Sequence, residues 1–270
     1  MAHVLKDKFD TAIQDFGFSV AARMFPNVIP VHKFFAGTVS TSRTTVCDVR
    51  SDSVYHWVNP SSYGAITLSS TSPADSIAGA GCRQMHVWGV TNSYDLRDEV
   101  VAMNGSNPVT TANSDYIHVW RAHGDLRNGI TNINSIQEAG SIGMTIAGVQ
   151  VARVQQARGQ TLMSPFIVPR GYTAYIYFGK ISSPSGKALS GAFYYRETAV
   201  DSAGGQSHSP LRTAHEFSAV AGGYDYPFSV PVPIPQYSRV QVDAQLDVGN
   251  ARVTGGYDLV LFPNVWDPSA

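Results

Sequence analysis

The chain has 270 residues, enough for one large or two small domains with a sizeable core. Charged residues make up only 14% of it, well below the roughly 25% of an average soluble domain, and the net charge is −1. No block of like charges suggests a nucleic-acid tail or a membrane-surface helix. We therefore expect no nucleic-acid partner and no membrane partner, and no run of about 18 apolar residues predicts a transmembrane span.

The first 35 residues are predicted to form an N-terminal arm. Phe9, Ile13 and Phe16 recur at helical spacing, and the later segment FPNVIP has two prolines that favour an extended connection. We expect the apolar side chains of this arm to pack on a neighbouring copy or on the particle, with folding back onto their own domain as the alternative. The predicted assembly residues are Phe9, Ile13, Phe16, Phe25, Val28 and Ile29.

After the arm, the sequence changes to short segments rich in β-branched and aromatic residues, most of them bounded by Gly, Pro, Asn or Ser. This pattern predicts an all-β fold, a sandwich or a barrel, over residues 36–270. A division of this body into two small β subdomains remains open. The predicted strands are 46–50, 63–70, 82–90, 98–103, 116–124, 142–154, 172–181, 190–200, 239–248 and 257–262.

Asn104 and Gly105 predict a tight turn. Both residue types adopt positive φ at low cost, so we expect a type I′ hairpin that leads onto a strand near Val109.

The stretch YDLRDE places Asp95, Arg97, Asp98 and Glu99 close together. Two carboxylates several ångströms apart could serve a glycosidase. Adjacent residues of a strand point to opposite faces, however, so Asp98 and Glu99 should diverge. The favoured interpretation is structural: the charges protect an exposed strand start against edge pairing.

Other chemistry has weaker support. His118 and His123 have no third ligand nearby and no metal-binding motif, so no metal site is expected. The stretch GQSHS around Ser207 approaches a serine-hydrolase nucleophile elbow but lacks the second glycine. Cys47 and Cys82 lack metal-ligand spacing. A disulfide framework is not indicated, but a single bridge stays open.

Tyrosines are dense on two consecutive predicted strands. Exposed rows of this kind can stack on sugar rings, but core or subunit-interface packing explains most of them. The residues assigned to this glycan or interface surface are Tyr172, Tyr175, Tyr177, Tyr194 and Tyr195.

The segment VWGVTNSYDLRDEVVAMNGSNPVTT, together with PFIVPRGYTAYI and GGYDLVLF, resembles a family of structural proteins of tailed bacteriophages, common in podoviruses and marine phages. That family carries GLDxxxNExxExVxLNGTTPVxT, then VPxGKxAYLT, then GFDLIL, and the resemblance spans about residues 87–264. Thr91, Asp95 and Leu96 depart from the pattern, which puts any binding role of that acidic loop in doubt. The matching positions are Gly89, Glu99, Val101, Asn104, Gly105, Pro108, Val109 and Thr111.

The resemblance implies a non-enzymatic virion protein with a jelly-roll-like β-sandwich, acting as a head-decoration, fibre or tail-associated subunit. We expect a symmetric homo-oligomer, with a trimer preferred, that contacts other virion proteins such as the major capsid, portal or tail proteins. No cofactor is expected. The protein would be made in the host bacterium's reducing cytoplasm and reside in the virion. The alternative is a carbohydrate-binding or receptor-binding module of the virion, and a hydrolase is least favoured.

Overall fold

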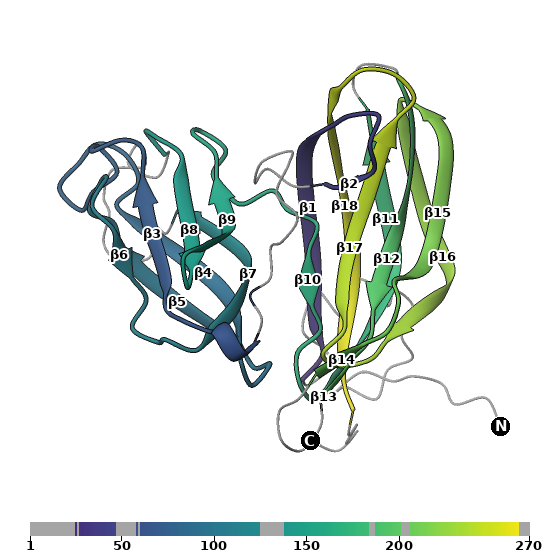
Figure 1. Ribbon diagram of the computed structural model, residues 1–270, viewed down its shortest axis with the longest axis horizontal. Coiled ribbons are helices and arrows are strands. Elements are labelled where there is room, and N and C mark those ends of the chain that lie inside the picture. The colour runs from purple at the N-terminus through teal and green to yellow at the C-terminus, as the bar shows by residue number, and fades with distance from the viewer. Residues whose placement is uncertain are drawn as a thin grey trace.

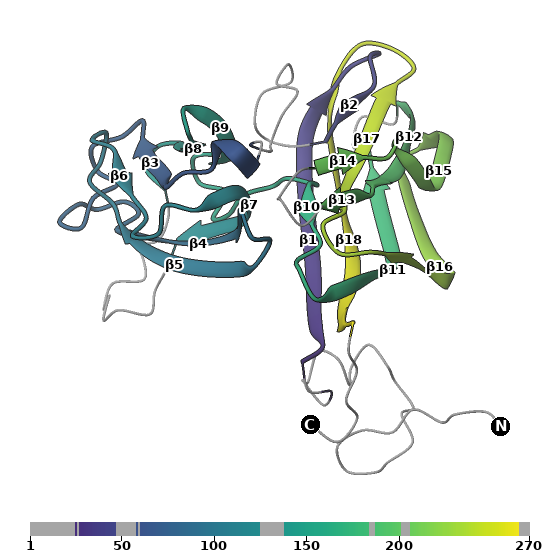
Figure 2. The same ribbon diagram turned by 60° about the horizontal axis from the view of Figure 1, so that its bottom comes forward.

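The computed structural model describes residue 25, residues 27–46, residue 58 and residues 60–124, 138–183, 187–200 and 206–264. The chain forms two β units that lie side by side, a larger sandwich and a smaller unit built from the segment between β2 and β10 (Figures 1 and 2). Over the described residues the only helical element is a short 3-10 turn, Pro60–Ser62. No helix in those ranges could therefore cross a membrane. Phe9, Ile13 and Phe16, whose spacing is helical, lie outside them.

The sandwich consists of two antiparallel sheets of four main strands each. One sheet has the order β1-β18-β11-β16, and the other has the order β10-β17-β12-β15 with the short β2 paired to β17. Its strands are β1 (Ile29–Val39), β2 (Thr44–Thr45), β10 (Phe166–Ile167), β11 (Tyr172–Ser182), β12 (Ala188–Arg196), β15 (Arg212–Ala221), β16 (Gly223–Ile234), β17 (Arg239–Leu246) and β18 (Ala251–Pro263).

The pairing follows a simple rule when the eight main strands are counted along the chain. The first pairs with the last (β1 with β18), the second with the seventh (β10 with β17), the third with the sixth (β11 with β16) and the fourth with the fifth (β12 with β15). A folded-over set of four such pairs is a jelly roll, in which the two sheets face one another. The all-β, jelly-roll-like sandwich expected from the sequence is confirmed.

The sandwich core follows from alternation along each strand. In β17 the pattern of half-buried and buried residues is strictly alternate, with Val240, Val242, Ala244 and Leu246 inside. These side chains belong to one apolar cluster that also takes in residues from β1, β11 and β18. Phe193 lies near the centre, with Phe217, Phe228 and Tyr257 rings 6.1 to 6.4 Å away.

The smaller unit has its own core, formed between the sheets β6-β3-β8-β9 and β5-β4-β7. Its strands are β3 (Ile66–Ser70), β4 (Gln84–Thr91), β5 (Leu96–Ala102), β6 (Val109–Thr110), β7 (Tyr116–Gly124), β8 (Ile142–Ile146) and β9 (Val149–Val154). A two-strand ribbon, β13 (Thr198–Val200) with β14 (Gln206–His208), lies off both units' main sheets.

The small unit is an insertion between the first and second strands of the roll. The chain leaves the sandwich after β2 and returns before β10. The points of exit and return lie side by side, where the Ser164 amide donates a hydrogen bond to the Val46 carbonyl at 3.1 Å. The inserted unit therefore interrupts the chain without interrupting the sandwich.

The structure corrects the arm boundary. β1 begins at Ile29 and pairs with β18 along its whole length, so residues 29–35 belong to the sandwich. Pro30 is tolerated because β1 is an edge strand, where a missing N–H leaves no partner unsatisfied. Phe25 and Val28 are buried against Val260 of the same chain.

Candidate functional site

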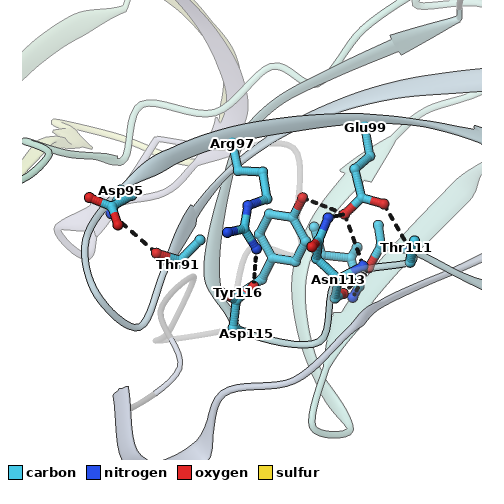
Figure 3. A network of polar contacts seen from close by, with 10 residues as sticks. Thr91, Asp95, Arg97, Glu99, Thr111, Asn113, Asp115 and Tyr116 are labelled. Atoms are coloured by element: carbon cyan, nitrogen blue, oxygen red, sulfur yellow. Dashed lines mark hydrogen bonds and ion pairs between the residues drawn. The ribbon is translucent and has the colours of Figure 1, made fainter.

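The charged stretch 95–99 leads into and forms the start of β5, and its two adjacent carboxylates point to opposite faces, as a strand requires. On the outer face, Asp98 lies 2.6 Å from Nε2 of the buried His86. On the other face, Glu99 turns toward the segment 111–116 (Figure 3). The two carboxylates therefore cannot act together on one bond.

Glu99 fixes the segment that precedes β7. Its carboxylate accepts hydrogen bonds from the Ala112 amide (2.8 Å), the Asn113 amide (3.2 Å), the Asn113 side chain (2.7 Å) and the Tyr116 hydroxyl (2.7 Å). Burial acts to raise the pKa of Glu99, but these hydrogen bonds outweigh it and lower the pKa. The Tyr116 hydroxyl is buried and donates to a carboxylate, so its pKa is raised. The pair is suited to holding a loop, not to transferring a proton near neutral pH.

The two remaining charged residues of the stretch also have partners. Arg97 donates to Asp115 at 2.6 Å, beside the Glu99 network (Figure 3). Asp95 accepts two hydrogen bonds from Arg170 of the sandwich, at 2.9 and 3.0 Å. Every charge of YDLRDE is thus engaged in fixing a loop, a neighbouring strand or the junction between the two units.

The expected Asn104–Gly105 hairpin is wrong. Gly105 has φ of +62°, but Asn104 is not among the described residues with positive φ. β5 pairs with β4, whereas β6 pairs with β3 in the opposite sheet. The turn therefore arches between two sheets, and the partly buried Val109 packs against the core that lies between them.

A buried carboxylate that belongs to no recognisable sequence motif organises this end of the inserted unit. Asp75 is fully buried and accepts from the amides of Cys82, Ala139 and Gly140 at 2.7 to 2.9 Å, and from the Ser70 hydroxyl at 2.5 Å. Four donors satisfy the charge that burial would otherwise penalise. The only sequence signal was an aspartate within a Ser/Thr/Pro-rich turn, which is also common for exposed loops.

The five tyrosines do not form one surface. Those on β11 and those on β12 lie in different sheets. Tyr172 and Tyr195 pack against the sandwich core, Tyr177 packs with Phe25 and Val28, and Tyr175 meets Phe262 edge-on. The Tyr194 hydroxyl accepts a hydrogen bond from Arg43 at 2.6 Å. The packing of Tyr172, Tyr177 and Tyr195 agrees with the interpretation that most of these tyrosines serve packing, and the five do not share one face.

The other assigned groups are also placed. His118 is fully buried in β7, and over the described ranges no group of three His, Cys, Asp or Glu side chains could hold a metal ion. Ser207 lies in β14, where it pairs with Ala199. Cys82 is a free, buried thiol whose pKa burial raises to about 12. The other cysteine, Cys47, and the arm residues Phe9, Ile13 and Phe16 lie outside the described residues.

The junction between the two units contains a buried lysine. Trp120 of β7 reaches the open side of the sandwich between β1 and β10 and meets Phe166 edge-on, 5.7 Å between ring centres. Lys33 of β1 is only 3% exposed, donates to the Trp120 carbonyl at 2.5 Å and lies over the Trp120 ring. Burial, with a smaller contribution from the nearby charge of Arg121, lowers its pKa to about 7.

Comparison with known proteins gives little support for any particular function. No family model matches the sequence, and no curated protein matches it with significance. Among solved structures, the chain is similar to a protein chain in the structure of infectious bursal disease virus Gx strain. The TM-score is 0.28 and the identity 10%, and the alignment covers 90% of this chain and 74% of that chain. A T=1 particle derived from the same virus aligns with a TM-score of 0.26, 10% identity, and coverage of 88% and 69%. At such low TM-scores these alignments carry no argument about function.

Proposed function

We propose that this chain is a non-enzymatic structural protein of a tailed-bacteriophage particle, a head-decoration, fibre or tail-associated subunit that assembles as a symmetric homo-oligomer, preferably a trimer. The observation that carries the proposal is the strand pairing of the sandwich, first with last through fourth with fifth, which is the jelly roll that viral capsid proteins share with lectins and cupins. Fold alone does not define function. The sequence resemblance to phage structural proteins selects the virion among these classes.

The charged stretch of β5 supports a structural role. In this segment, which carries most of the resemblance, Glu99 holds the loop before β7 through four hydrogen bonds. A residue committed to four donors contributes to shape and not to turnover. The low content of charged residues also suits a repeated subunit, since interfaces between copies bury area without desolvating many charges.

Phe25 and Val28 are already buried on their own sandwich, so the proposed assembly arm keeps only the residues before Phe25. We propose that Phe9, Ile13 and Phe16 dock on a neighbouring copy or on the particle. Deleting residues 1–24 should leave the melting temperature unchanged and abolish incorporation into particles. Deleting residues 1–30 should in addition lower the melting temperature. Normal incorporation of the 1–24 deletion would refute the arm.

The proposal is tested by fractionating lysates of a phage that encodes the chain. Particles are purified on a density gradient, and their proteins are identified and quantified by mass spectrometry. We expect the chain in the particle fraction at a fixed ratio to the major capsid protein, and an oligomer in native mass spectrometry of the purified chain. A chain that remains monomeric and is found only in the soluble host fraction would contradict the proposed function.

A further inference from the structure

The outer face of the sheet β1-β18-β11-β16 is hollowed over a band of small residues. One row across all four strands consists of Ala36, Thr254, Ser182 and Gly223, which are mutual register partners. The Ser182 hydroxyl is hydrogen-bonded to the Thr254 hydroxyl at 2.9 Å. Short side chains in successive strands leave space above the sheet, and the Ser182 and Thr254 hydroxyls lie on the floor of this hollow.

The next row supplies one wall. Its members in strand order are Phe34, Gly256, Lys180 and Asp225. Because Gly256 has no side chain, Lys180 can reach across it, and its ammonium lies 5.5 Å from the centre of the Phe34 ring. A Cβ on Gly256 would lie 3.4 Å from the Lys180 side chain and 2.7 Å from the Lys33 carbonyl. The glycine therefore permits the cation and the ring to stand together at the surface.

Two hollows meet at Phe34, which is 42% exposed. The first, of about 350 Å³, lies toward Lys180, Ser182 and Asp225. The second, of about 260 Å³, lies toward Arg158, Gln160 and Arg252. Phe34, Thr254 and Gly255 line both, so the hollows are adjacent compartments of one groove.

The charges of the groove are distributed unequally. One compartment pairs a lysine with a carboxylate, and the other presents two arginines and an amide, with no acidic side chain among the described residues that line it. Carboxylates and amides bind sugar hydroxyls, arginine binds carboxylates through two parallel hydrogen bonds, and an exposed ring packs on the C–H face of a pyranose. The groove thus offers a neutral-sugar compartment beside an anion compartment.

We propose that this groove is a binding site for an acidic saccharide of at least two rings. Phe34 packs against the chain where the two compartments meet, Asp225 and Ser182 bind the hydroxyls of a neutral ring, and Arg158 binds the carboxylate of the next ring. A nucleic acid fits less well, because its regularly spaced phosphates would place a negative charge beside Asp225. The site is independent of the proposed place in a particle, so either idea can fail alone.

The test uses the full chain on an immobilised panel of neutral, uronate-containing, sialylated and sulfated oligosaccharides. Each uronate member is paired with its carboxyl-reduced counterpart. We expect retention of carboxylated members and at least about tenfold weaker retention of the reduced ones. Phe34→Ala should weaken binding at least about tenfold. Arg158→Gln should reduce the preference for carboxylated members, and Arg158→Lys should restore part of it.

The matched control is Tyr63→Ala, which removes another exposed ring from the inserted unit and should leave binding unchanged. Equal melting temperatures for all variants show that folding is not the cause of any loss. The proposal is overturned if no panel member is retained, if reduced and carboxylated forms bind equally, or if Phe34→Ala binds like the wild type. Stronger binding of a single-stranded DNA 20-mer than of any saccharide would also overturn it.

Discussion

The side chain of Glu99 alone accepts the four hydrogen bonds that hold residues 112–116 in place. Glu99→Gln keeps the shape but turns an amide N–H₂ toward groups that donate, so at least one of the four donors loses its acceptor. We expect the free energy of unfolding at pH 7 to fall by about 1–3 kcal/mol. Thermal and urea denaturation measure the change. Glu216→Gln, on the exposed side of β15, is the matched control and should have little effect.

The same residue sets a pH dependence. The pKa of Glu99 is lowered in the folded state, so its contribution to stability is complete above the unfolded-state pKa near 4.5 and is lost as the pH falls through the folded-state value. Stability of the wild type should therefore fall more steeply below pH 4.5 than that of Glu99→Gln. Parallel pH profiles would show that the network contributes no charge-dependent stability.

Lys33 sets a second pH dependence, with the same sign but in a higher pH range, because burial at the junction disfavours its charged form and lowers its pKa to about 7. Between pH 7 and its ordinary value of 10.5 the unfolded chain binds more protons than the folded one, so stability should rise with pH over this range. Lys33→Met should remove that rise, measured as melting temperature from pH 7 to pH 10. Lys187→Met, at a less buried position, should retain it. An unchanged profile in Lys33→Met would assign the pH dependence to other groups.

Among the turns, Gly105 and Gly148 allow the cost of positive φ to be distinguished from the cost of steric crowding, because both have positive φ and only Gly105 is crowded. An alanine at Gly105 would have to adopt positive φ, and its Cβ would lie 2.9 Å from the Pro73 backbone. An alanine at Gly148 would also have to adopt positive φ, but its Cβ would meet nothing within 4 Å. Gly148→Ala should cost about 1 kcal/mol, and Gly105→Ala should cost more. Denaturant titration of the two variants measures the difference. Equal costs would mean that the Pro73 contact yields without penalty.

Strand positions were predictable from the sequence where alternation and β-branched residues coincide. The prediction of residues 116–124 matches β7, and the predicted strand 142–154 is divided into β8 and β9 by the turn at Ala147 and Gly148. Three long strands were missed, β1, β15 and β16, and all three lie at a sheet edge; β1 and β16 contain prolines. Proline is compatible with an edge, but the sequence does not show which strand will be one.

The site was less predictable than the strands. The opposed directions of Asp98 and Glu99 follow from the strand period alone. The partners of Glu99 lie 13 to 17 residues away, and Asp75 meets donors up to 65 residues away. The Phe34 groove joins strands from both ends of the chain. Such contacts depend on how the sheets assemble, which local patterns do not specify.

At the scale of the whole molecule, the insertion should be separable. Val46 and Ser164 are hydrogen-bonded, so a short Gly/Ser linker can replace residues 47–163 without moving either end. We expect the remaining sandwich to give a β-type circular dichroism spectrum and a cooperative transition at lower temperature, since Phe166 loses Trp120. Lys33 becomes exposed, so the rise in stability from pH 7 to pH 10 should disappear. A chain without cooperative melting would show that the sandwich needs its insertion.

A cryo-electron microscopy map of purified phage particles, at side-chain resolution, tests the virion role most directly. We expect density for a jelly roll with the small β unit beside the β1 and β10 edge, repeated by a symmetry of the particle, with residues 1–24 in contact with a neighbouring subunit. A fully assigned map of infectious particles in which no density fits this chain would contradict the proposed function.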